Sequence, residues 1–211
     1  MDISIKQLNR LVAFLDGIER DAYSEPLSIV HSQVTQVAVR ILLGKYCSSG
    51  TRILDIGCGQ GPALELFRNA GLQAIGVALN ETDVRACQNR GFDAYVMDQS
   101  FLAFEDASFD IIWARHVLEH SIMPLYTLHE FYRVLRPGGI LYVEVPASDT
   151  IARHEENPNH YSMLTRRGWE ALFVKSGYQI LEYKEYPLLI TAGPDAGHED
   201  MFWGFYCCKV S

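Results

Sequence analysis

The sequence lacks the features of several protein classes. No apolar run approaches the roughly 18 residues that suggest a membrane-spanning helix, and the N-terminal MDISIKQLNR has no basic stretch followed by an apolar one, the mark of a secretory signal. The five cysteines are odd in number and form no C-x-x-C pair, which argues against a disulfide scaffold. We therefore expect a cytoplasmic protein that does not enter a membrane.

Positive charge is also scarce. The 211 residues include 18 Lys and Arg against 26 Asp and Glu, a formal net charge of −8. Proteins that bind nucleic acid usually present a basic surface, so the charge argues against that partner and favours a small-molecule substrate. A chain of this length, 48% of it hydrophobic, can bury the core of one domain. The sequence does not predict the oligomeric state.

Two helices are predicted before residue 48. Apolar residues recur at spacings of three and four between residues 3 and 18, and a second helical stretch runs from Pro26 to about Tyr46. We expect residues 1–48 to form a helical cap that covers a ligand cleft as a lid.

From residue 51 onward, short apolar runs alternate with helical segments. Strands are predicted at residues 52–57, 73–79, 93–98, 109–114 and 140–145. Helices are predicted between them at residues 62–71, 81–91 and 124–135. Such alternation is typical of an α/β fold with a doubly wound, mostly parallel sheet and helices on both faces.

The last third of the sequence has a different order of elements. An irregular polar segment is followed by a helix at 166–177 and then by strands at 178–186 and 201–210. The loop between these two strands is rich in glycine and proline and has no helical pattern, so the strands should pair in an antiparallel hairpin. We therefore expect seven strands in all, with the hairpin at one edge of the sheet.

The turn after the first predicted strand is rich in glycine. LDIGCGQG places Gly57, Gly59 and Gly61 between strand and helix, with Asp55 two residues before the first glycine. Glycines there let backbone amides approach a ligand at the carboxyl end of the sheet, although the same pattern also fits a plain tight turn. The spacing is G-x-G-x-G and not the dinucleotide fingerprint G-x-G-x-x-G, which argues against a nicotinamide oxidoreductase.

Three motifs together resemble one family. RILDIGCGQG resembles the first motif of class I S-adenosylmethionine-dependent methyltransferases, FDIIWARHVLEH their fourth-strand motif, and LHEFYRVLRPGGILYVEVP their helix, turn and fifth strand. The resemblance covers about residues 51–147. It implies a single methyltransferase domain, residues 1–211, with a cofactor-binding core at 51–147 and an acceptor-side loop, helix and hairpin at 148–211.

The resemblance also implies how S-adenosylmethionine is bound. The glycine turn would pass beneath its methionine end, Asp55 would orient that turn and the amino group, and Asp98 matches the acid that accepts a hydrogen bond from the adenine amine. Carboxylates suit both tasks because they accept N–H donors strongly. The implied cofactor-binding residues are Asp55, Gly57, Cys58, Gly59, Gly61, Leu79, Asn80, Asp98, Gln99, Ser100 and Arg115.

The second predicted strand departs from the family pattern. The family usually ends this strand with an acid that holds both ribose hydroxyls, whereas GVALNE has Ala78 and Leu79 there. Ala78 has no side-chain acceptor, and Asn80 is the nearest substitute. A non-catalytic cofactor-binding or scaffold protein of the same fold is therefore an alternative.

RHVLEH, residues 115–120, contains H-x-x-E-H, which in isolation is a zinc-peptidase signature. Peptidase runs of this kind lie inside a long helix, whereas this one follows directly on the strand at 109–114. LEH is frequent at this turn in the methyltransferases. We therefore expect no peptidase.

Two histidines, His116 and His160, are candidate catalytic residues. Methyl transfer to oxygen or nitrogen needs an acceptor that can lose a proton, and a neutral imidazole takes one near pH 7. His116 leaves the fourth strand where the acceptor should meet the methyl group, although a structural, hydrogen-bonded role fits its position equally well. His160 belongs to RHEENPNHYS, a segment that the family fold places over the cofactor.

A second comparison implies a metal site. The small-RNA 2′-O-methyltransferases of the same superfamily bind a divalent metal through acids, an xxEH run and a later histidine. On that comparison Glu119, His120 and His160 match, and His116 replaces an acid. Three imidazoles and one carboxylate suit zinc or iron better than magnesium. LEH also occurs in relatives that use no metal, so the metal is an alternative and not the expectation.

Together these patterns predict an S-adenosylmethionine-dependent methyltransferase. We expect it to methylate an oxygen or nitrogen of a small molecule and to release S-adenosylhomocysteine. The scaffold protein and a metal-dependent methyltransferase acting on a ribose or catechol-like diol are the alternatives.

Overall fold

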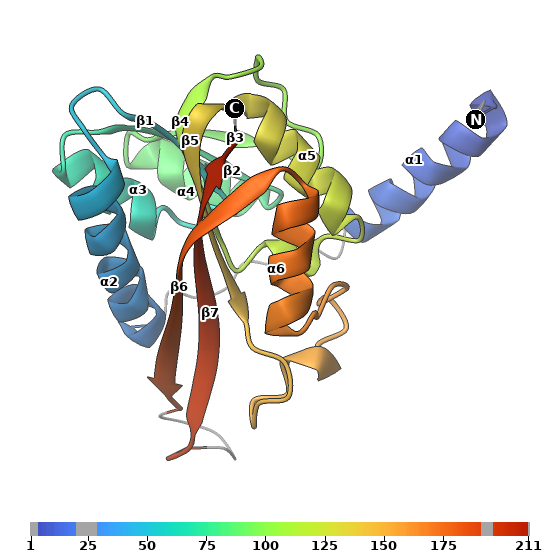
Figure 1. The fold of residues 1–211 in the computed structure, drawn as a ribbon. Coiled ribbons are helices and arrows are strands. Elements are labelled where there is room, and N and C mark those ends of the chain that lie inside the picture. Colours follow the sequence, from blue (N-terminus) through green and yellow to red (C-terminus); the bar gives the residue numbers. More distant parts are fainter. Residues whose placement is uncertain (1–3, 20–28, 191–195, 211) are drawn as a thin grey trace.

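The computed structural model describes residues 4–19, 29–190 and 196–210. Its centre is one seven-stranded sheet with the strand order β3-β2-β1-β4-β5-β7-β6 (Figure 1). The strands are β1 Arg52–Ile56, β2 Gln73–Ala78, β3 Asp93–Val96, β4 Phe109–Arg115, β5 Leu135–Pro146, β6 Tyr178–Leu189 and β7 Glu199–Lys209. The first five strands in this order are parallel, and β7 is antiparallel to both β5 and β6. This confirms the predicted sheet and its terminal hairpin.

Helices precede the sheet and connect its strands. They are α1 Ile5–Glu19, α2 Ile29–Tyr46, α3 Pro62–Asn69, α4 Glu81–Asn89, α5 Pro124–Val134 and α6 Arg166–Lys175, with two short 3-10 helices, η1 Leu118–His120 and η2 His154–Glu156. Within the described residues, no helix is both long enough and apolar enough to cross a bilayer.

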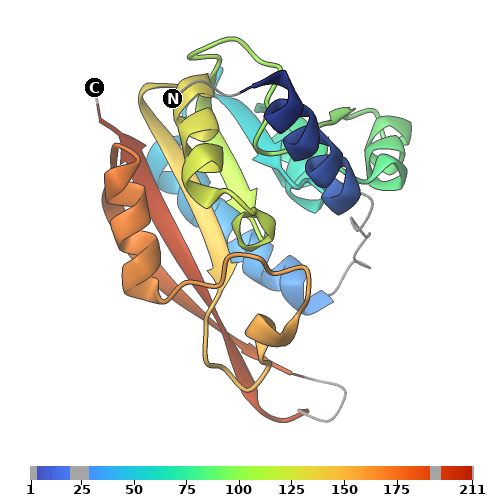
Figure 2. The ribbon, with the colours of Figure 1, turned by 90° about the vertical axis from the view of Figure 1, so that its right-hand side faces the viewer.

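The sheet is covered on both faces, as the continuous apolar strands require. On one face, α5 and α6 lie side by side (Figure 2). Leu128 and Phe131 of α5 and Phe173 of α6 pack there against Leu141 and other buried strand residues. On the opposite face, α2 and α3 join a second buried cluster with the alternate strand residues. Successive strand residues therefore serve different layers, because their side chains point to opposite faces.

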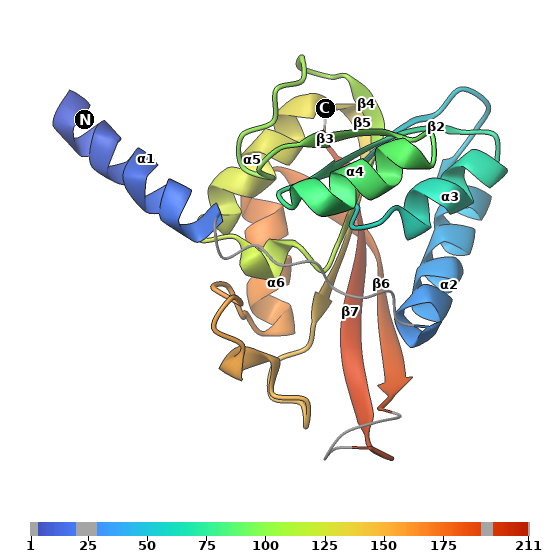
Figure 3. The ribbon, with the colours of Figure 1, turned by 180° about the vertical axis from the view of Figure 1, so that it is seen from behind.

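The N-terminal helices differ from the predicted lid. Ala38 and Leu42 of α2 are fully buried and pack with Trp113 and Tyr142 of the sheet, so α2 belongs to the layer that covers one face. Helix α1 projects away from the sheet (Figures 1 and 3). Its apolar side chains are exposed, namely those of Ile5, Leu8, Leu11, Val12 and Phe14. Amphipathic spacing predicted both helices correctly but did not indicate what each would cover.

Candidate active site

The glycine turn connects the carboxyl end of β1 to α3. Gly57 and Gly59 have φ values of 66° and 49°, in the left-handed region that favours glycine. A side chain at Gly57 would collide with Cγ1 of Val117, so this residue must stay small. At Gly59 nothing lies within 4 Å of the place where a Cβ would stand. The turn is therefore packed on its inner side and open on its outer side, where backbone amides can meet a ligand.

Asp55 lies on β1 directly before this turn. Its side chain is buried, with an exposed fraction of 2%, and its Oδ2 atom has no hydrogen-bond partner within the described part of the chain. Burial raises the pKa of Asp55 well above its usual value, and Cys87 adds to this, while the charge of Arg115 opposes it. A buried carboxylate oxygen without a donor fits the ammonium group of a cationic ligand such as S-adenosylmethionine.

The residues after β3 face the same end of the sheet. Asp98 accepts a hydrogen bond from the backbone N–H of Ser100 at 2.5 Å, and the Ser100 hydroxyl lies 2.8 Å from that of Thr127. Gln99 donates its amide to the backbone oxygen of Val117 at 2.8 Å. Its Oε1 atom is buried and, among the residues described, has no hydrogen-bond donor. The predicted adenine-side residues are therefore held in place with an acceptor still unsatisfied.

The end of β2 provides fewer ligand groups. Ala78 is buried, and the Asn80 side chain caps α4 by accepting hydrogen bonds from the backbone N–H groups of Thr82 and Asp83 at 2.9 and 3.3 Å. The oxygen of Asn80 is therefore already engaged by its own helix, and Leu79 is half-buried beside it. The ribose contact expected of Asn80 stays a prediction.

Cys58 directs its side chain inward from the glycine turn. It is buried, and its thiol donates toward the backbone oxygen of Gly59 at 3.6 Å, an atom that Cys87 also approaches at 3.2 Å. A Cβ at Gly76 would meet the Cys58 sulfur at 2.7 Å. Cys58 therefore fills the space between β2 and the turn, and only its backbone could face a ligand.

A buried charge cluster stands at the carboxyl ends of β4 and β5. Glu144 is fully buried, and its Oε1 atom lies 2.7 Å from Nε of Arg115 and 3.0 Å from Nε2 of His116. The Tyr142 hydroxyl donates to its other oxygen at 2.6 Å. Burial alone would raise the pKa of Glu144, but Arg115, His116 and Tyr142 outweigh it and lower that pKa to about 2. Nη2 of Arg115 is buried without a hydrogen-bond partner in the described structure.

His116 lies between two carboxylates. Its Nδ1 atom is 3.6 Å from Oε1 of Glu119, its Nε2 atom contacts Glu144, and its ring meets that of Phe202 edge-on with centroids 4.7 Å apart. Burial and Arg115 lower the pKa of His116, but its hydrogen bonds to Glu119 and Glu144 raise it more, so the net shift is upward. These surroundings favour a cationic, hydrogen-bonded imidazole. A role as general base stays a prediction.

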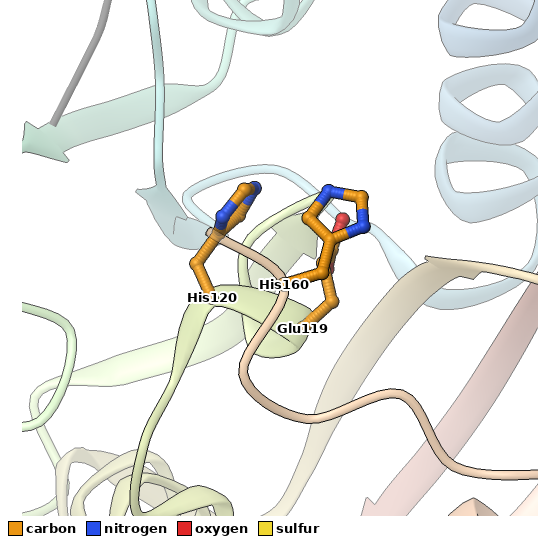
Figure 4. Close-up of side chains that lie close together, drawn as sticks. All are labelled: Glu119, His120 and His160. Carbon is orange, nitrogen blue, oxygen red and sulfur yellow. The ribbon is translucent and has the colours of Figure 1, made fainter. Parts of the chain in front are cut away.

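Three of the four predicted metal ligands lie together. Glu119, His120 and His160 each offer a ligand atom, and these atoms lie within 4.8 Å of one another (Figure 4). His120 and His160 each use Nδ1 to contact a backbone oxygen, that of Asn159 at 2.9 Å and that of His154 at 2.7 Å. Burial lowers the pKa of His160. For Glu119, burial raises the pKa, but His116 and His120 outweigh it and the net shift is downward.

Two residues at this site were not singled out from the sequence. One is Glu144, which could have been found, because it is the one acid inside the apolar run ILYVEV. The other is Asp200, a buried carboxylate on β7 that lies 2.7 Å from Nε2 of His154 and accepts a hydrogen bond from the Thr150 hydroxyl at 3.0 Å. The Asp200 contacts tie the segment after β5 to the terminal hairpin. No motif indicated them.

Comparison with known proteins shows to which family the chain belongs. Residues 30–183 match the family model described as a methyltransferase domain. The chain therefore belongs to this methyltransferase family. Its fold is similar to the solved structure of a SAM-dependent methyltransferase from Methanosarcina mazei, with a TM-score of 0.69, 18% identity and coverage of 80% of this chain and 97% of that one. At this identity the likeness shows the class I fold alone.

Particular relatives are similar over shorter stretches. The chain is 35% identical over 102 residues to 27-O-demethylrifamycin SV methyltransferase of Amycolatopsis mediterranei (strain S699). This match spans 44% of this chain and 38% of the relative. It is 32% identical over 121 residues to sterol 24-C-methyltransferase erg6 of Schizosaccharomyces pombe. This second match spans 51% of this chain and 32% of the relative. The match thus covers well under half the length of these relatives.

Proposed function

We propose that the protein is an S-adenosylmethionine-dependent methyltransferase that methylates an oxygen or nitrogen of a small molecule. The observation that carries this proposal is the buried Oδ2 atom of Asp55, near the carboxyl end of β1, which lacks a hydrogen-bond donor in the described structure. The turn that follows is open at Gly59. Membership of the methyltransferase family supports the same activity.

The site residues divide the binding of the cofactor among them. Asp55 would accept hydrogen bonds from its ammonium group, and Nη2 of Arg115 would donate to its carboxylate, since each of these atoms is buried with no partner in the described chain. Asp98 and the unsatisfied oxygen of Gln99 would accept from the adenine amine. Groups of opposite charge would thus meet the ammonium and the carboxylate, which share the α-carbon of the methionine moiety, and would fix how that end of the cofactor is oriented.

The chemistry is an in-line displacement in which position supplies much of the acceleration. When bound, the cofactor supplies a methyl group on a positively charged sulfur. A lone pair of the acceptor forms the new bond to carbon as the carbon–sulfur bond breaks, and that bonding pair returns to sulfur. The acceptor proton leaves to solvent or to a base, for which His116 and His160 are the proposed residues. Burial lowers the pKa of His160, which favours the neutral form that a base needs, whereas His116 could accept a proton only in the neutral form that its contacts with Glu119 and Glu144 disfavour. The products are the methylated acceptor and S-adenosylhomocysteine.

The nature of the acceptor is supported by two kinds of observation. The two relatives are named for small-molecule substrates, one for an oxygen position and one for a carbon position. In this chain the acceptor side carries His116, His154 and His160, whose rings lie close to one another or to Phe202. Such polar groups favour an acceptor that bears a hydroxyl or an amine, because they can hydrogen-bond it.

The test has two stages. Isothermal titration should first show that the protein binds S-adenosylmethionine and S-adenosylhomocysteine. Incubation with methyl-labelled cofactor and a panel of hydroxyl- and amine-bearing small molecules should then give labelled product and an equal amount of S-adenosylhomocysteine by mass spectrometry. A folded protein that binds neither nucleoside at millimolar concentration would contradict the proposal.

A non-catalytic protein of the same fold is the second candidate. One observation favours it, namely that Ala78 stands where the ribose-binding acid is expected while the oxygen of Asn80 is used to cap α4. Tight binding of the cofactor without methyl transfer to any member of a broad panel would support this candidate.

A further inference from the structure

We propose that Glu119, His120 and His160 bind one divalent transition-metal ion, and that this ion holds an oxygen acceptor for methyl transfer. The inference rests on the proposed function and deepens it, because it names the class of acceptor. The three side chains come from two separate segments, η1 after β4 and the loop after β5, and converge on one point (Figure 4).

The Glu119 carboxylate offers an acceptor atom at this point that could bind a cation. It has an exposed fraction of 1%, and its Oε2 atom is buried with no hydrogen-bond donor among the residues that the structure describes. Its other oxygen lies 3.6 Å from Nδ1 of His116. A buried charged oxygen without a partner costs stability, and a cation placed against it removes that cost. Figure 4 shows a carboxylate oxygen of Glu119 close to the ring of His160.

The two imidazoles are oriented as metal ligands commonly are. In each ring, Nδ1 contacts a backbone carbonyl oxygen, at 2.9 Å for His120 and 2.7 Å for His160. A carbonyl oxygen only accepts, so Nδ1 must carry the proton, and Nε2 is then the nitrogen that can coordinate an ion. A backbone carbonyl on the second ring nitrogen is a frequent outer partner of metal-bound histidine, because it fixes both tautomer and orientation.

The two segments are held together without an ion. The backbone N–H of Ser162 donates to the oxygen of Glu119 at 2.9 Å, and the Ser162 hydroxyl donates to the oxygen of Ser121 at 2.6 Å. His154, whose carbonyl orients His160, is itself anchored to buried Asp200. The backbone is therefore organised in advance. Two atoms bound about 2.1 Å from one ion lie at most about 4.2 Å apart, so binding needs only a small closing movement of side chains.

His116 does not belong to this metal-binding group. Its ring nitrogens lie near Glu144 and Glu119. In the described part of the chain, it is not one of the three residues whose ligand atoms all lie within 4.8 Å of one another. The ligand set is thus two imidazoles and one carboxylate, which suits zinc or iron better than magnesium, because magnesium prefers oxygen ligands. His116 instead connects the metal ligand Glu119 to the Glu144 cluster.

Three protein ligands leave coordination positions for the acceptor. We assign to them a small molecule with two neighbouring oxygens, such as a 1,2-diol or a catechol. Coordination lowers the pKa of the acceptor hydroxyl. The hydroxyl proton passes to solvent, the oxygen forms a bond to the methyl carbon, the carbon–sulfur bond breaks and its electron pair goes to sulfur. No oxidant or reductant takes part.

The site is tested by metal titration of the full chain, purified without a histidine tag and dialysed against a chelator. Zinc binding is measured calorimetrically, and cobalt binding by its visible absorption. We expect one ion per chain, and affinity at least tenfold weaker in His160→Ala and Glu119→Gln. His129→Ala is the matched control, because His129 is an exposed histidine on α5, and it should bind as the unchanged protein does. His160 lies in a half-buried loop, so its variant remains informative even if Glu119→Gln fails to fold.

Cofactor binding by the same variants separates this inference from the proposed function. Both variants should keep the affinity for S-adenosylhomocysteine, whose binding residues lie elsewhere, while methylation of a diol is lost. Equal zinc affinity in His160→Ala and in the unchanged protein would overturn the metal site. If the two variants lose zinc binding while the unchanged protein binds zinc but no cofactor, the metal site is upheld and the proposed methyltransferase function is overturned.

Discussion

The Nε2 atom of His116 lies 3.0 Å from Oε1 of Glu144, a fully buried carboxylate on the neighbouring strand. Arg115, the residue before His116, pairs with Glu144 in the sheet register and approaches the same oxygen at 2.7 Å. One carboxylate thus fixes two consecutive residues at the end of β4. The turn to η1 begins there, so Glu144 anchors the start of the segment that carries Glu119 and His120.

Removing the charge of Glu144 should destabilise the fold. Glu144→Gln leaves Arg115 buried without its counter-charge, and breaking a buried ion pair in this way typically costs about 3–5 kcal/mol. Chemical denaturation should show this loss at pH 7. Glu105→Gln, at an exposed position, is the control and should change stability by less than about 0.5 kcal/mol. Unchanged stability of Glu144→Gln would show that the cluster contributes little.

The Glu144 contribution should also depend on pH. Its pKa in the folded protein is lowered to about 2, from an ordinary value of 4.5. A lowered folded pKa stabilises the protein above the ordinary pKa, and this stabilisation is lost as the pH falls toward the folded value. The difference in melting temperature between the unchanged protein and Glu144→Gln should therefore be full at pH 7 and shrink below about pH 4.5. A difference that grows on acidification would contradict the assignment.

Asp55 should control the affinity for the cofactor. Asp55→Asn keeps the shape of the side chain but removes the charge that would bind the ammonium group, so the dissociation constant for S-adenosylmethionine should rise at least tenfold. Asp93→Asn, an exposed change at the opposite end of β3, should leave it unchanged. Equal binding by both variants would place the amino group elsewhere.

Cofactor binding should release a proton. Burial raises the pKa of Asp55 in the ligand-free protein, whereas a bound ammonium group favours its ionised form. The affinity for S-adenosylmethionine should therefore rise with pH until Asp55 is ionised in the free protein. Calorimetric titrations in buffers of different ionisation enthalpy should measure the number of protons released on binding. In Asp55→Asn the proton released by Asp55 should be absent from that number. A proton count that is the same in this variant would contradict the linkage.

Replacing each of the first two glycines of the turn by alanine should lower the stability of the protein by different amounts. At Gly57 a methyl group meets both a positive φ and Val117, so we expect a loss of about 2–4 kcal/mol in stability. At Gly59 the positive φ remains but the space is open, so the loss should be about 1–2 kcal/mol. The Gly59→Ala methyl points into the proposed ligand space, and it should weaken cofactor binding more than its effect on stability explains. Thermal unfolding and calorimetric titration measure both effects, and equal losses of stability would contradict the packing described at Val117.

Much of the fold could be predicted because its elements have strong local patterns. Buried strands appear as apolar runs, the glycine turn directly follows β1, and the hairpin was indicated by a loop without helical pattern. RPGG, expected as a turn before the fifth strand, instead lies within the bounds of β5. The placement of α1 could not be predicted, because amphipathic spacing shows that a helix has an apolar face and not what covers it. Its apolar residues are exposed in the structure.

The site was predictable to a smaller extent, since its contacts join residues far apart in the chain. The family motifs singled out Asp55 and Asp98 as cofactor-binding candidates, a role that stays a prediction, and each of them lies near a strand end. Motif spacing could not distinguish His116 from His120, although they are four residues apart. The ring of His116 contacts the Glu144 carboxylate, whereas the ring of His120 contacts the backbone oxygen of Asn159 in the loop after β5. That difference depends on strand pairing and on Asn159, and neither is visible in RHVLEH.

A crystal structure with S-adenosylhomocysteine tests the central claim most directly. The account predicts the ligand across the carboxyl ends of β1 to β4, with its amino group on Asp55, its methionine portion over Gly57 to Gly61 and its adenine toward Asp98. A ligand that binds away from this turn, or one that lies there with its amino group far from Asp55, would contradict it.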